Sequence, residues 1–308
     1  MKIAAIIPCY KIKNDIIDLI NKSLNYFDEI IVVDDKCPYQ TGFKVQNRFE
    51  NKKKVKVLFN DKNLGVGGAI KNGIHYLLNK NIDIFVKIDG DGQMSLNDLD
   101  FLLKPIINNQ ALYVKGSRFL NYNSKKIMPI QRYYGNKLMS LFFRFFSNDL
   151  SLTDPLNGYL VMSNKIFDLI NYKKLSNDFF FETDLLFFLK EKKIKVIEIP
   201  VTINYEDHNS SFKPILESYN FTSKFIKKSI KRLIFTHLNL KKLSIMFIPT
   251  SLLVFTFFYS LIDLLKLISY LILEKKIDII SLIKIFFNMA TYFIIYRIFD
   301  IIYANVKR

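Results

Sequence analysis

Short apolar runs alternate with amphipathic helical stretches from residue 1 to about residue 205. The runs rich in Val, Ile and Phe that have strand length are residues 3–7, 29–33, 54–59, 84–88, 113–116 and 196–199. Strands that alternate with helices are typical of βαβ units around a mainly parallel sheet. The pattern therefore predicts an α/β domain over residues 1–212, with its chemistry just after the strands, where such sheets bind ligands.

The pattern changes at residue 213. Between residues 213 and 242, eight lysines and arginines face a single acid, Glu217, and are interleaved with Phe, Ile and Leu. This composition predicts a basic amphipathic segment that binds anionic lipid; a solvated helical face is the alternative.

Two long apolar runs follow, at residues 243–273 and 277–303. Each is long enough to cross a hydrocarbon core of about 30 Å at about 1.5 Å per residue. Only a tight turn separates them, so residues 243–308 are predicted to form a two-helix transmembrane hairpin. Because both runs contain charged residues, two buried helices of a water-soluble domain are the alternative. Lysine and arginine flank both outer ends of the hairpin, which places those ends and the large domain in the cytoplasm.

Composition narrows the choice of partner. The 308 residues carry 45 Lys and Arg against 28 Asp and Glu, a net charge of +17, which indicates nucleic acid, anionic lipid or a phosphorylated substrate. Cys9 and Cys37 are too few for a disulfide framework, match no metal motif by spacing, and favour a reducing compartment. The first ten residues include Pro8 and no cleavage site, so they predict a strand and not a signal peptide.

Asp89-Gly90-Asp91 is the strongest local signal for chemistry. It follows a strand, and alternate residues of an extended chain point the same way, so both carboxylates can converge on one cation. Oxygen ligands suit Mg²⁺ or Mn²⁺, with phosphate oxygens completing the shell. An ordinary acidic turn is the alternative.

Other polar groups also follow predicted strands. The carboxylates of Asp34 and Asp35 end the second strand, where they could accept hydrogen bonds from a nucleotide. The glycine-rich stretch from Asn63 through Gly65 to Ala69 could bring backbone N–H groups and a helix N-terminus to phosphate or sugar. Arg118 and Arg132 could bind phosphate, although single arginines are more often solvated charges. The first strand is not followed by a glycine-rich turn, which argues against a dehydrogenase.

The order of these motifs resembles the family 2 glycosyltransferases of the GT-A fold, which is Rossmann-like. The resemblance covers residues 1 to about 215 and is carried by these segments: Ile6-Ile7-Pro8-Cys9-Tyr10, Val32-Val33-Asp34-Asp35, Asn63-Leu64-Gly65, Asp89-Gly90-Asp91-Gly92-Gln93, Gly116-Ser117-Arg118-Phe119, Asp154 with Asn157-Gly158-Tyr159, and Glu182-Thr183-Asp184. The basic segment and the hairpin resemble those of the polyisoprenyl-phosphate glycosyltransferases, the branch of dolichyl-phosphate mannose synthase and the bactoprenyl glucosyltransferases.

The resemblance implies roles for individual residues. It assigns donor or acceptor binding to Pro8, Tyr10, Asp34, Asp35, Asn63, Gly65, Asp89, Gln93, Arg118, Arg132 and Lys213, and metal binding to Asp89 and Asp91. Lys213 resembles part of a loop that closes over the donor, but the usual Gly-x-Ser-Lys pattern is not intact there. Catalytic roles fall to Asp91, Glu182, Asp184 and Asp154.

The family's common route is a single inverting displacement at the anomeric carbon. If the acceptor is a sugar hydroxyl, a carboxylate must take its proton, and Glu182 or Asp184 is the candidate base. A lipid phosphate is already ionised and needs no base; Glu182, Asp184 and Asp154 would then position groups. A charge that favours the following helix is a further alternative for Glu182.

The resemblance thus implies metal-dependent transfer of a hexose from a UDP or GDP sugar to polyprenyl phosphate, with Mg²⁺ or Mn²⁺ as cofactor. The site would lie on the cytoplasmic face of a membrane that a multi-pass protein crosses, in the synthesis of a cell-wall or surface polysaccharide; a homo-oligomer is compatible with this. The rivals are a membrane-tethered enzyme that extends a glycan at a saccharide hydroxyl, and a non-catalytic sensor of nucleotide sugars. A nucleic-acid binder is disfavoured because the positive charge gathers beside the apolar hairpin.

Overall fold

The computed structural model describes residues 1–13, 15–147, 151–202, 224 and 227–228. The chain divides into two compact units, Met1–Phe225 and Ile226–Arg308. Every helix and strand named below belongs to the first unit. The predicted domain boundary after residue 212, the basic segment 213–242 apart from Lys224, Lys227 and Lys228, and the hairpin 243–308 lie outside the described residues and stay predictions.

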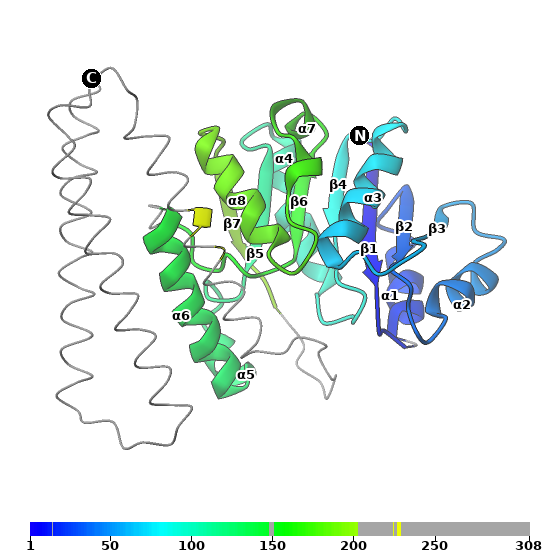
Figure 1. Cartoon of the computed structure of the whole chain (residues 1–308), viewed down its shortest axis with the longest axis horizontal. Helices are drawn as coiled ribbons and strands as arrows, with labels where there is room; N and C mark the ends of the chain where they lie inside the picture. Colours follow the sequence, from blue (N-terminus) through cyan, green and yellow to red (C-terminus); the bar gives the residue numbers. More distant parts are fainter. Residues whose placement is uncertain (14, 148–150, 203–223, 225–226, 229–308) are drawn as a thin grey trace, which may run out of the picture. The chain divides into compact units, whose positions relative to one another are not determined.

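A seven-stranded sheet forms the centre of the first unit (Figure 1). Its order is β3-β2-β1-β4-β6-β5-β7. The strands are β1 (Ile3–Cys9), β2 (Glu29–Asp34), β3 (Val55–Phe59), β4 (Ile84–Lys87), β5 (Tyr113–Ser117), β6 (Leu160–Ser163) and β7 (Val196–Pro200). All neighbouring strands are parallel except β6, which runs antiparallel to β4 and to β5. The predicted mainly parallel α/β sheet is confirmed; β6 was not predicted, because a run of four residues carries no clear period.

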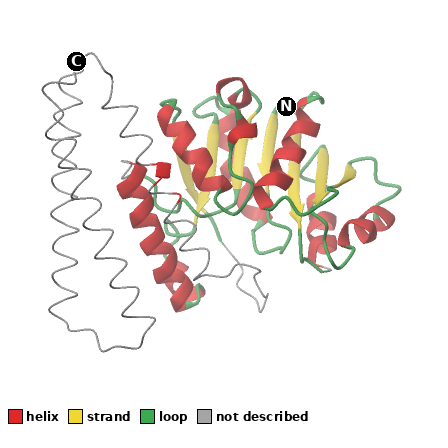
Figure 2. Ribbon diagram, in the orientation of Figure 1, coloured by secondary structure: helices red, strands yellow, loops and turns green. Residues whose placement is uncertain are grey.

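Helices lie on both faces of the sheet (Figure 2). They are α1 (Asp15–Ser23), α2 (Thr41–Arg48), α3 (Val66–Leu78), α4 (Leu99–Ile107), α5 (Ser124–Ile127), α6 (Ile130–Ser147), α7 (Ile166–Leu169) and α8 (Phe181–Glu191), with single 3₁₀ turns at Leu96–Asp98 and Tyr172–Lys174. In the part of the chain that the structure describes, no helix is both long and apolar enough to cross a membrane.

Alternation along the strands decides which side chains meet which helices. One hydrophobic cluster joins Ala5, Ile7, Ile30 and Val32 with buried residues of α1, α2 and α4. Ile6, between Ala5 and Ile7, and Val33, after Val32, face α3 instead. Gly73 of α3 is so close that a Cβ there would lie 2.6 Å from Ile6 Cγ2. Because successive strand residues point to opposite faces, neighbouring residues at a strand end also point to different loops.

Candidate active site

Asp34 and Asp35, at the end of β2, point to different loops. Asp34 Oδ1 accepts a hydrogen bond from the Cys37 amide at 2.8 Å, and its Oδ2 accepts one from the Gly42 amide at 2.7 Å. The side chain is 4% exposed. A Cβ at residue 42 would overlap the Asp34 carboxylate, so the glycine is needed for this close approach. Asp34 therefore fixes the connection between β2 and α2.

The two cysteines meet beside Asp34. The ligand atoms of Cys9, Asp34 and Cys37 lie within 4.8 Å of one another and are buried, and both cysteines are free thiols. The Cys37 thiol contacts the Thr41 hydroxyl at 3.4 Å. Burial, together with the nearby Cys37 and Asp34, raises the pKa of the Cys9 thiol. Cysteine spacing in the sequence predicted no metal site; this cluster arises because β1 and β2 are neighbours. Cys37 Sγ also lies 3.8 Å from the carbonyl oxygen of Ile12, so the loop after β2 contacts the segment after β1.

Asp35 binds the glycine-rich stretch. Its Oδ1 accepts hydrogen bonds from the Asn60 side chain at 2.7 Å and the Leu64 amide at 2.8 Å, and its Oδ2 accepts one from the Gly65 amide at 2.7 Å. Asp35 is 1% exposed, whereas Asn63 is exposed at the surface of the loop. The carboxylate thus organises the loop that begins α3.

The glycines of that loop allow close packing. Gly65 has φ 84°, and a Cβ there would lie 2.6 Å from the carbonyl oxygen of Asn177. Gly67 is packed against the carbonyl of Ser176, and the Gly68 amide donates to Asn177 O at 2.9 Å. The amides of Gly65 and Gly68 therefore have partners within the chain, and the predicted phosphate contact of this loop stays a prediction.

Asp89 and Asp91 follow β4, with Gly90 between them. A Cβ at Gly90 would lie 2.7 Å from Ile12 Cδ1 and 3.2 Å from the carbonyl oxygen of Pro8, so glycine lets this turn approach the end of β1. Asp91 Oδ1 accepts a hydrogen bond from the Gln93 amide at 3.1 Å. The side chains of Asp89 and Asp91 are partly exposed. Two accessible carboxylates with oxygen ligands only are a donor set that fits Mg²⁺ or Mn²⁺.

Lys87, the last residue of β4, binds two carboxylates at once. Its Nζ lies 2.6 Å from Asp89 Oδ1 and 2.8 Å from Glu182 Oε1. The lysine side chain is 2% exposed, that of Glu182 8% and that of Asp89 34%. Burial alone would lower the pKa of Lys87, but the attraction of Asp89 and Glu182 outweighs it and raises that pKa. The ammonium therefore stays charged beneath the predicted metal ligands.

The segment Asn157-Gly158-Tyr159 lies against this ion pair. A Cβ at Gly158 would overlap Lys87 Nζ and would lie 2.8 Å from Asp89 Oδ2. Asn157 Oδ1 accepts a hydrogen bond from the Tyr159 amide at 3.0 Å, which holds the turn. The glycine at position 158 is thus explained by its contact with charged groups from β4.

Arg118 and Asp154 form a second buried ion pair. Arg118 Nε donates to Asp154 Oδ2 and Nη2 donates to Oδ1, each at 2.7 Å, and the Arg118 amide also donates to Oδ2 at 3.0 Å. Asp154 is fully buried. Burial would raise the pKa of Asp154, but Arg118 and Lys115 lower it overall. The guanidinium that was predicted to bind phosphate thus donates two parallel hydrogen bonds to a carboxylate of the chain itself.

Two further charged side chains support that pair. Glu198, on β7, accepts hydrogen bonds from the Thr153 amide at 2.6 Å and the Asp154 amide at 2.9 Å. Lys115, on β5, donates to the Asp154 carbonyl at 2.5 Å and is fully buried. Burial lowers the pKa of Lys115 to about 8, although Asp154 and Glu198 oppose that shift.

Glu182 and Asp184 lie in the first turn of α8 and are both buried. Asp184 Oδ2 accepts hydrogen bonds from the Ser176 amide at 2.9 Å and the Ser176 hydroxyl at 3.1 Å. Asp184 therefore fixes the loop that packs against the glycines of α3, while Glu182 turns toward β4.

The remaining predicted residues are more scattered. Pro8 is buried within β1, and Tyr10, just beyond it, is 36% exposed. Arg132 lies partly exposed near the start of α6, and Lys213 falls outside the described residues. The structure thus brings Asp89 and Glu182 together through Lys87, and pairs Arg118 with Asp154.

Sequence reasoning missed Lys87 and Lys115. A signal was present: each lysine directly follows apolar residues of a predicted strand, residues 84–86 or 113–114, where an unpaired charge is costly. A lysine at such a position indicates buried acidic partners.

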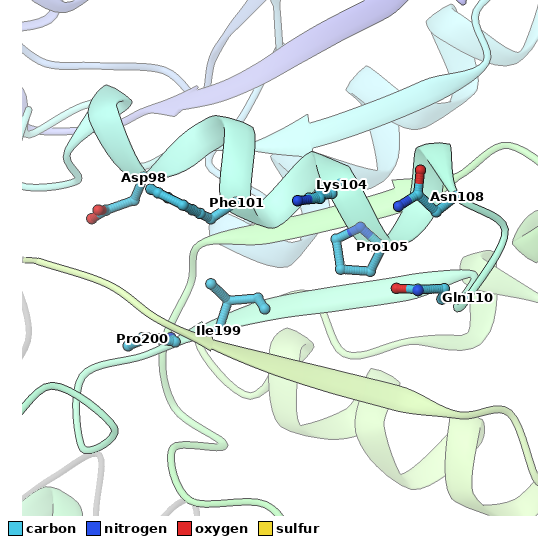
Figure 3. Close-up of a pocket in the computed structure, with 8 residues that line it drawn as sticks. All are labelled: Asp98, Phe101, Lys104, Pro105, Asn108, Gln110, Ile199 and Pro200. Carbon is cyan, nitrogen blue, oxygen red and sulfur yellow. The ribbon is translucent and has the colours of Figure 1, made fainter.

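A pocket of about 410 Å³ lies between α4 and β7 (Figure 3). It is lined by residues of those two elements, of the 3₁₀ turn before α4 and of the turn after it: Asp98, Phe101, Lys104, Pro105, Asn108, Gln110, Ile199 and Pro200. None of the predicted site residues lines it, so the pocket is separate from the charged groups described above.

Comparison with known proteins identifies the family. Residues 4–170 match the family model described as Glycosyl transferase family 2. The chain is 28% identical over 218 residues to the UDP-N-acetylglucosamine–dolichyl-phosphate N-acetylglucosaminyltransferase of Methanococcus voltae, covering 66% of this chain and 86% of that protein. It is 28% identical over 175 residues to the undecaprenyl-phosphate mannosyltransferase of Micrococcus luteus, covering 56% and 71%.

A solved structure shares the fold. Glucosyl-3-phosphoglycerate synthase from Mycobacterium tuberculosis, in complex with Mn²⁺, UDP and phosphoglyceric acid, has a TM-score of 0.56 and 15% identity, and covers 75% of this chain and 78% of that one. The similarity supports the predicted GT-A architecture. Together with the match over residues 4–170, it leads to one conclusion: the chain belongs to glycosyl transferase family 2 and is a glycosyltransferase.

Proposed function

We propose that this glycosyltransferase moves a sugar from a nucleoside-diphosphate sugar to a polyprenyl phosphate at the cytoplasmic face of a membrane. Two relatives support the acceptor: their names specify dolichyl phosphate and undecaprenyl phosphate. The name of the first also specifies a UDP sugar as donor. The basic and apolar composition of residues 213–308 supports attachment to a membrane that holds such lipids.

The observation that carries the choice of acceptor is the contact of Glu182 with Lys87. Glu182 is the predicted base for a hydroxyl acceptor, but its Oε1 lies 2.8 Å from a buried ammonium and the side chain is 8% exposed. A general base must reach the proton that it removes. A phosphate acceptor is already anionic and attacks without proton removal, so it is compatible with a Glu182 that is held in an ion pair.

The donor would bind along the ends of β1, β2 and β4. Asp89 and Asp91 would hold Mg²⁺ or Mn²⁺ together with the donor diphosphate, and a structure of the same fold contains Mn²⁺ and UDP. When bound, the ion would neutralise charge that develops on the departing nucleoside diphosphate. Pro8, Tyr10 and Asn63 are the proposed contacts of the nucleotide and sugar. Asp35, which is 1% exposed, would instead shape the loop beside them through its hydrogen bonds to Leu64 and Gly65.

The chain's own residues would direct the acceptor. An acceptor phosphate would approach the anomeric carbon from the face opposite the departing diphosphate, so that configuration inverts. In this proposal Arg118 is the first contact of the acceptor phosphate. Asp154 does not touch the acceptor but orients Arg118 through the two 2.7 Å contacts. Arg132, partly exposed on α6, is the second proposed contact for an acceptor phosphate.

Transfer to lipid tests the proposal. The full chain, in membranes or detergent, would be incubated with labelled UDP or GDP sugars and polyprenyl phosphate, and the organic phase would be analysed by mass. A lipid monophosphate sugar is expected. Label that appears only on added saccharides would instead support a membrane-tethered enzyme that extends a glycan.

Glu182→Gln distinguishes the two acceptors. Loss of a general base typically costs about 10²- to 10⁴-fold in rate. With a phosphate acceptor, the variant should keep donor binding and lose less than about 100-fold. A larger loss with intact donor binding would identify Glu182 as the base of a hydroxyl transfer and would reject the phosphate acceptor.

A further inference from the structure

The buried cation at the end of β4 has no role in the chemistry proposed above. Lys87 lies on the central strand β4, between β1 and β6, and is 1% exposed. An ammonium in the interior loses its hydration, and replacing a whole buried ion pair by apolar side chains of similar size is often neutral or stabilising. Stability alone therefore does not explain an ion pair at this place.

Three separate segments converge on the Lys87 ammonium. Asp89 comes from the turn after β4, Glu182 from the first turn of α8, and Gly158 from the segment before β6. A side chain at position 158 would overlap the ammonium. The absence of a Cβ there is what lets the backbone of this segment lie against the charged group.

The Asp89 carboxylate contacts the buried ammonium and is still partly exposed. Oδ1 lies 2.6 Å from the buried ammonium, while the side chain as a whole is 34% exposed. Oδ2 lies near Gly158, where a Cβ would be 2.8 Å from it. The carboxylate is thus held from inside, while part of the side chain stays exposed to a ligand. Groups that hydrogen-bond to metal-binding carboxylates orient them, and their loss typically weakens metal binding about 10- to 100-fold.

We infer that Lys87 is a positioning residue: it holds Asp89 in the orientation that binds the divalent cation and links that carboxylate to Glu182. This inference rests on the proposed cation site at Asp89 and Asp91. In this inference Glu182 holds Lys87 in place and does not act as a general base. It also explains why Gly158 is needed, since the ammonium occupies the space that a Cβ would take.

The chain offers a matched control for this role. Lys115 is a second fully buried lysine, on strand β5, and its side chain points to the same face of the sheet as that of Lys87. Lys115 donates to the carbonyl of Asp154, and no contact between it and Asp89 is among the described hydrogen bonds and ion pairs. Lys87→Met and Lys115→Met remove the same charge from equally buried positions.

Binding of Mn²⁺ in the presence of UDP, without acceptor or sugar transfer, tests the inference. Titration of the full chain, followed by the loss of the free Mn²⁺ electron paramagnetic resonance signal, should show about 10- to 100-fold weaker binding for Lys87→Met. Lys115→Met should change it by less than about twofold. A folded Lys87→Met variant that binds Mn²⁺ like wild type would overturn the role.

Lys87→Met leaves Glu182 buried without its cation, so folding needs its own measurement. Lys87→Met/Glu182→Gln removes both charges and should fold while retaining the weakened Mn²⁺ binding. Loss of the folded state in both variants, judged by circular dichroism, would make Lys87 a structural residue and would overturn the positioning role. A wild-type chain that binds no Mn²⁺ with UDP would reject the cation site and this role together; missing lipid product with intact Mn²⁺ binding would reject only the proposed acceptor.

Discussion

Buried and partly buried aspartates have different partners in the two halves of the sheet. At the end of β2, Asp34 and Asp35 accept hydrogen bonds from amides of the loops that follow. Around β4, β5 and β6, Asp89 and Asp154 instead meet Lys87 and Arg118. Amide partners fix the shape of a loop, whereas charged partners compensate a buried charge. In the first half the aspartates therefore fix the conformation of loops, and in the second half they neutralise nearby positive charges.

Replacing Asp154 by Asn should give the largest effect. It leaves the guanidinium of Arg118, whose side chain is 14% exposed, without its counter-charge. Breaking a buried ion pair from one side costs roughly 3–5 kcal/mol of unfolding free energy. Chemical unfolding of the full chain in detergent would measure it. The double variant Asp154→Asn/Arg118→Gln should recover part of the loss; a single variant within about 1 kcal/mol of wild type would contradict the buried pair.

Asp89→Asn should have a comparable effect, but on activity. The change removes a charge from the proposed cation site, so transfer should fall by on the order of 100- to 1,000-fold. Lys87 keeps Glu182 as a counter-charge, so the variant should stay folded. Initial rates at several Mn²⁺ concentrations would measure it. Asp100→Asn, at an exposed position of α4, is the control and should behave like wild type. Full activity in Asp89→Asn would reject the proposed site.

Lys115→Met should show a pH-dependent effect on stability. Burial lowers the pKa of Lys115 from 10.5 to about 8, so below pH 8 the folded state bears the full cost of the charge. Between pH 8 and 10.5 the unfolded state binds more protons, and wild-type stability rises with pH through this group.

The stability of Lys115→Met relative to that of wild type should therefore fall by up to roughly 3 kcal/mol across that window. Unfolding curves of both proteins from pH 7 to pH 10.5 would measure the difference. Lys104→Met, at an exposed position of α4, is the matched lysine control. A constant difference between Lys115→Met and wild type would contradict the lowered pKa.

Asp35→Asn should give the smallest effect. One carboxylate oxygen becomes an amide NH₂ group that faces amide donors, so at least one hydrogen bond from Asn60, Leu64 or Gly65 is lost. Such a loss costs about 1–3 kcal/mol when the group is buried. Thermal unfolding would measure it, with the exposed Asp61→Asn as control. A loss as large as that of Asp154→Asn would remove the distinction between the two halves of the sheet.

Local pattern was enough to predict the strands that are buried on both faces. The apolar runs that become β1, β2 and β4 are continuous, and their ends carry Asp34, Asp35 and Asp89. The strand β6 was missed because its four residues are defined by pairing with β4 and β5, which their own sequence does not encode. The sequence also gave no indication that Asp34 and Asp35 would face different loops with internal partners.

By itself, the amino-acid sequence determined the alternation of strands and helices, the positions of the acidic motifs and the family, because these depend on residues that are close along the chain. Only the tertiary structure decided which charges meet. Lys87 and Glu182 are 95 residues apart in the sequence, and Arg118 and Asp154 are 36 apart. Their contacts depend on the order of strands in the sheet and on where α8 packs. Both are decided by how apolar surface is buried across the whole domain, and not by the hydrophobic periodicity of any one segment.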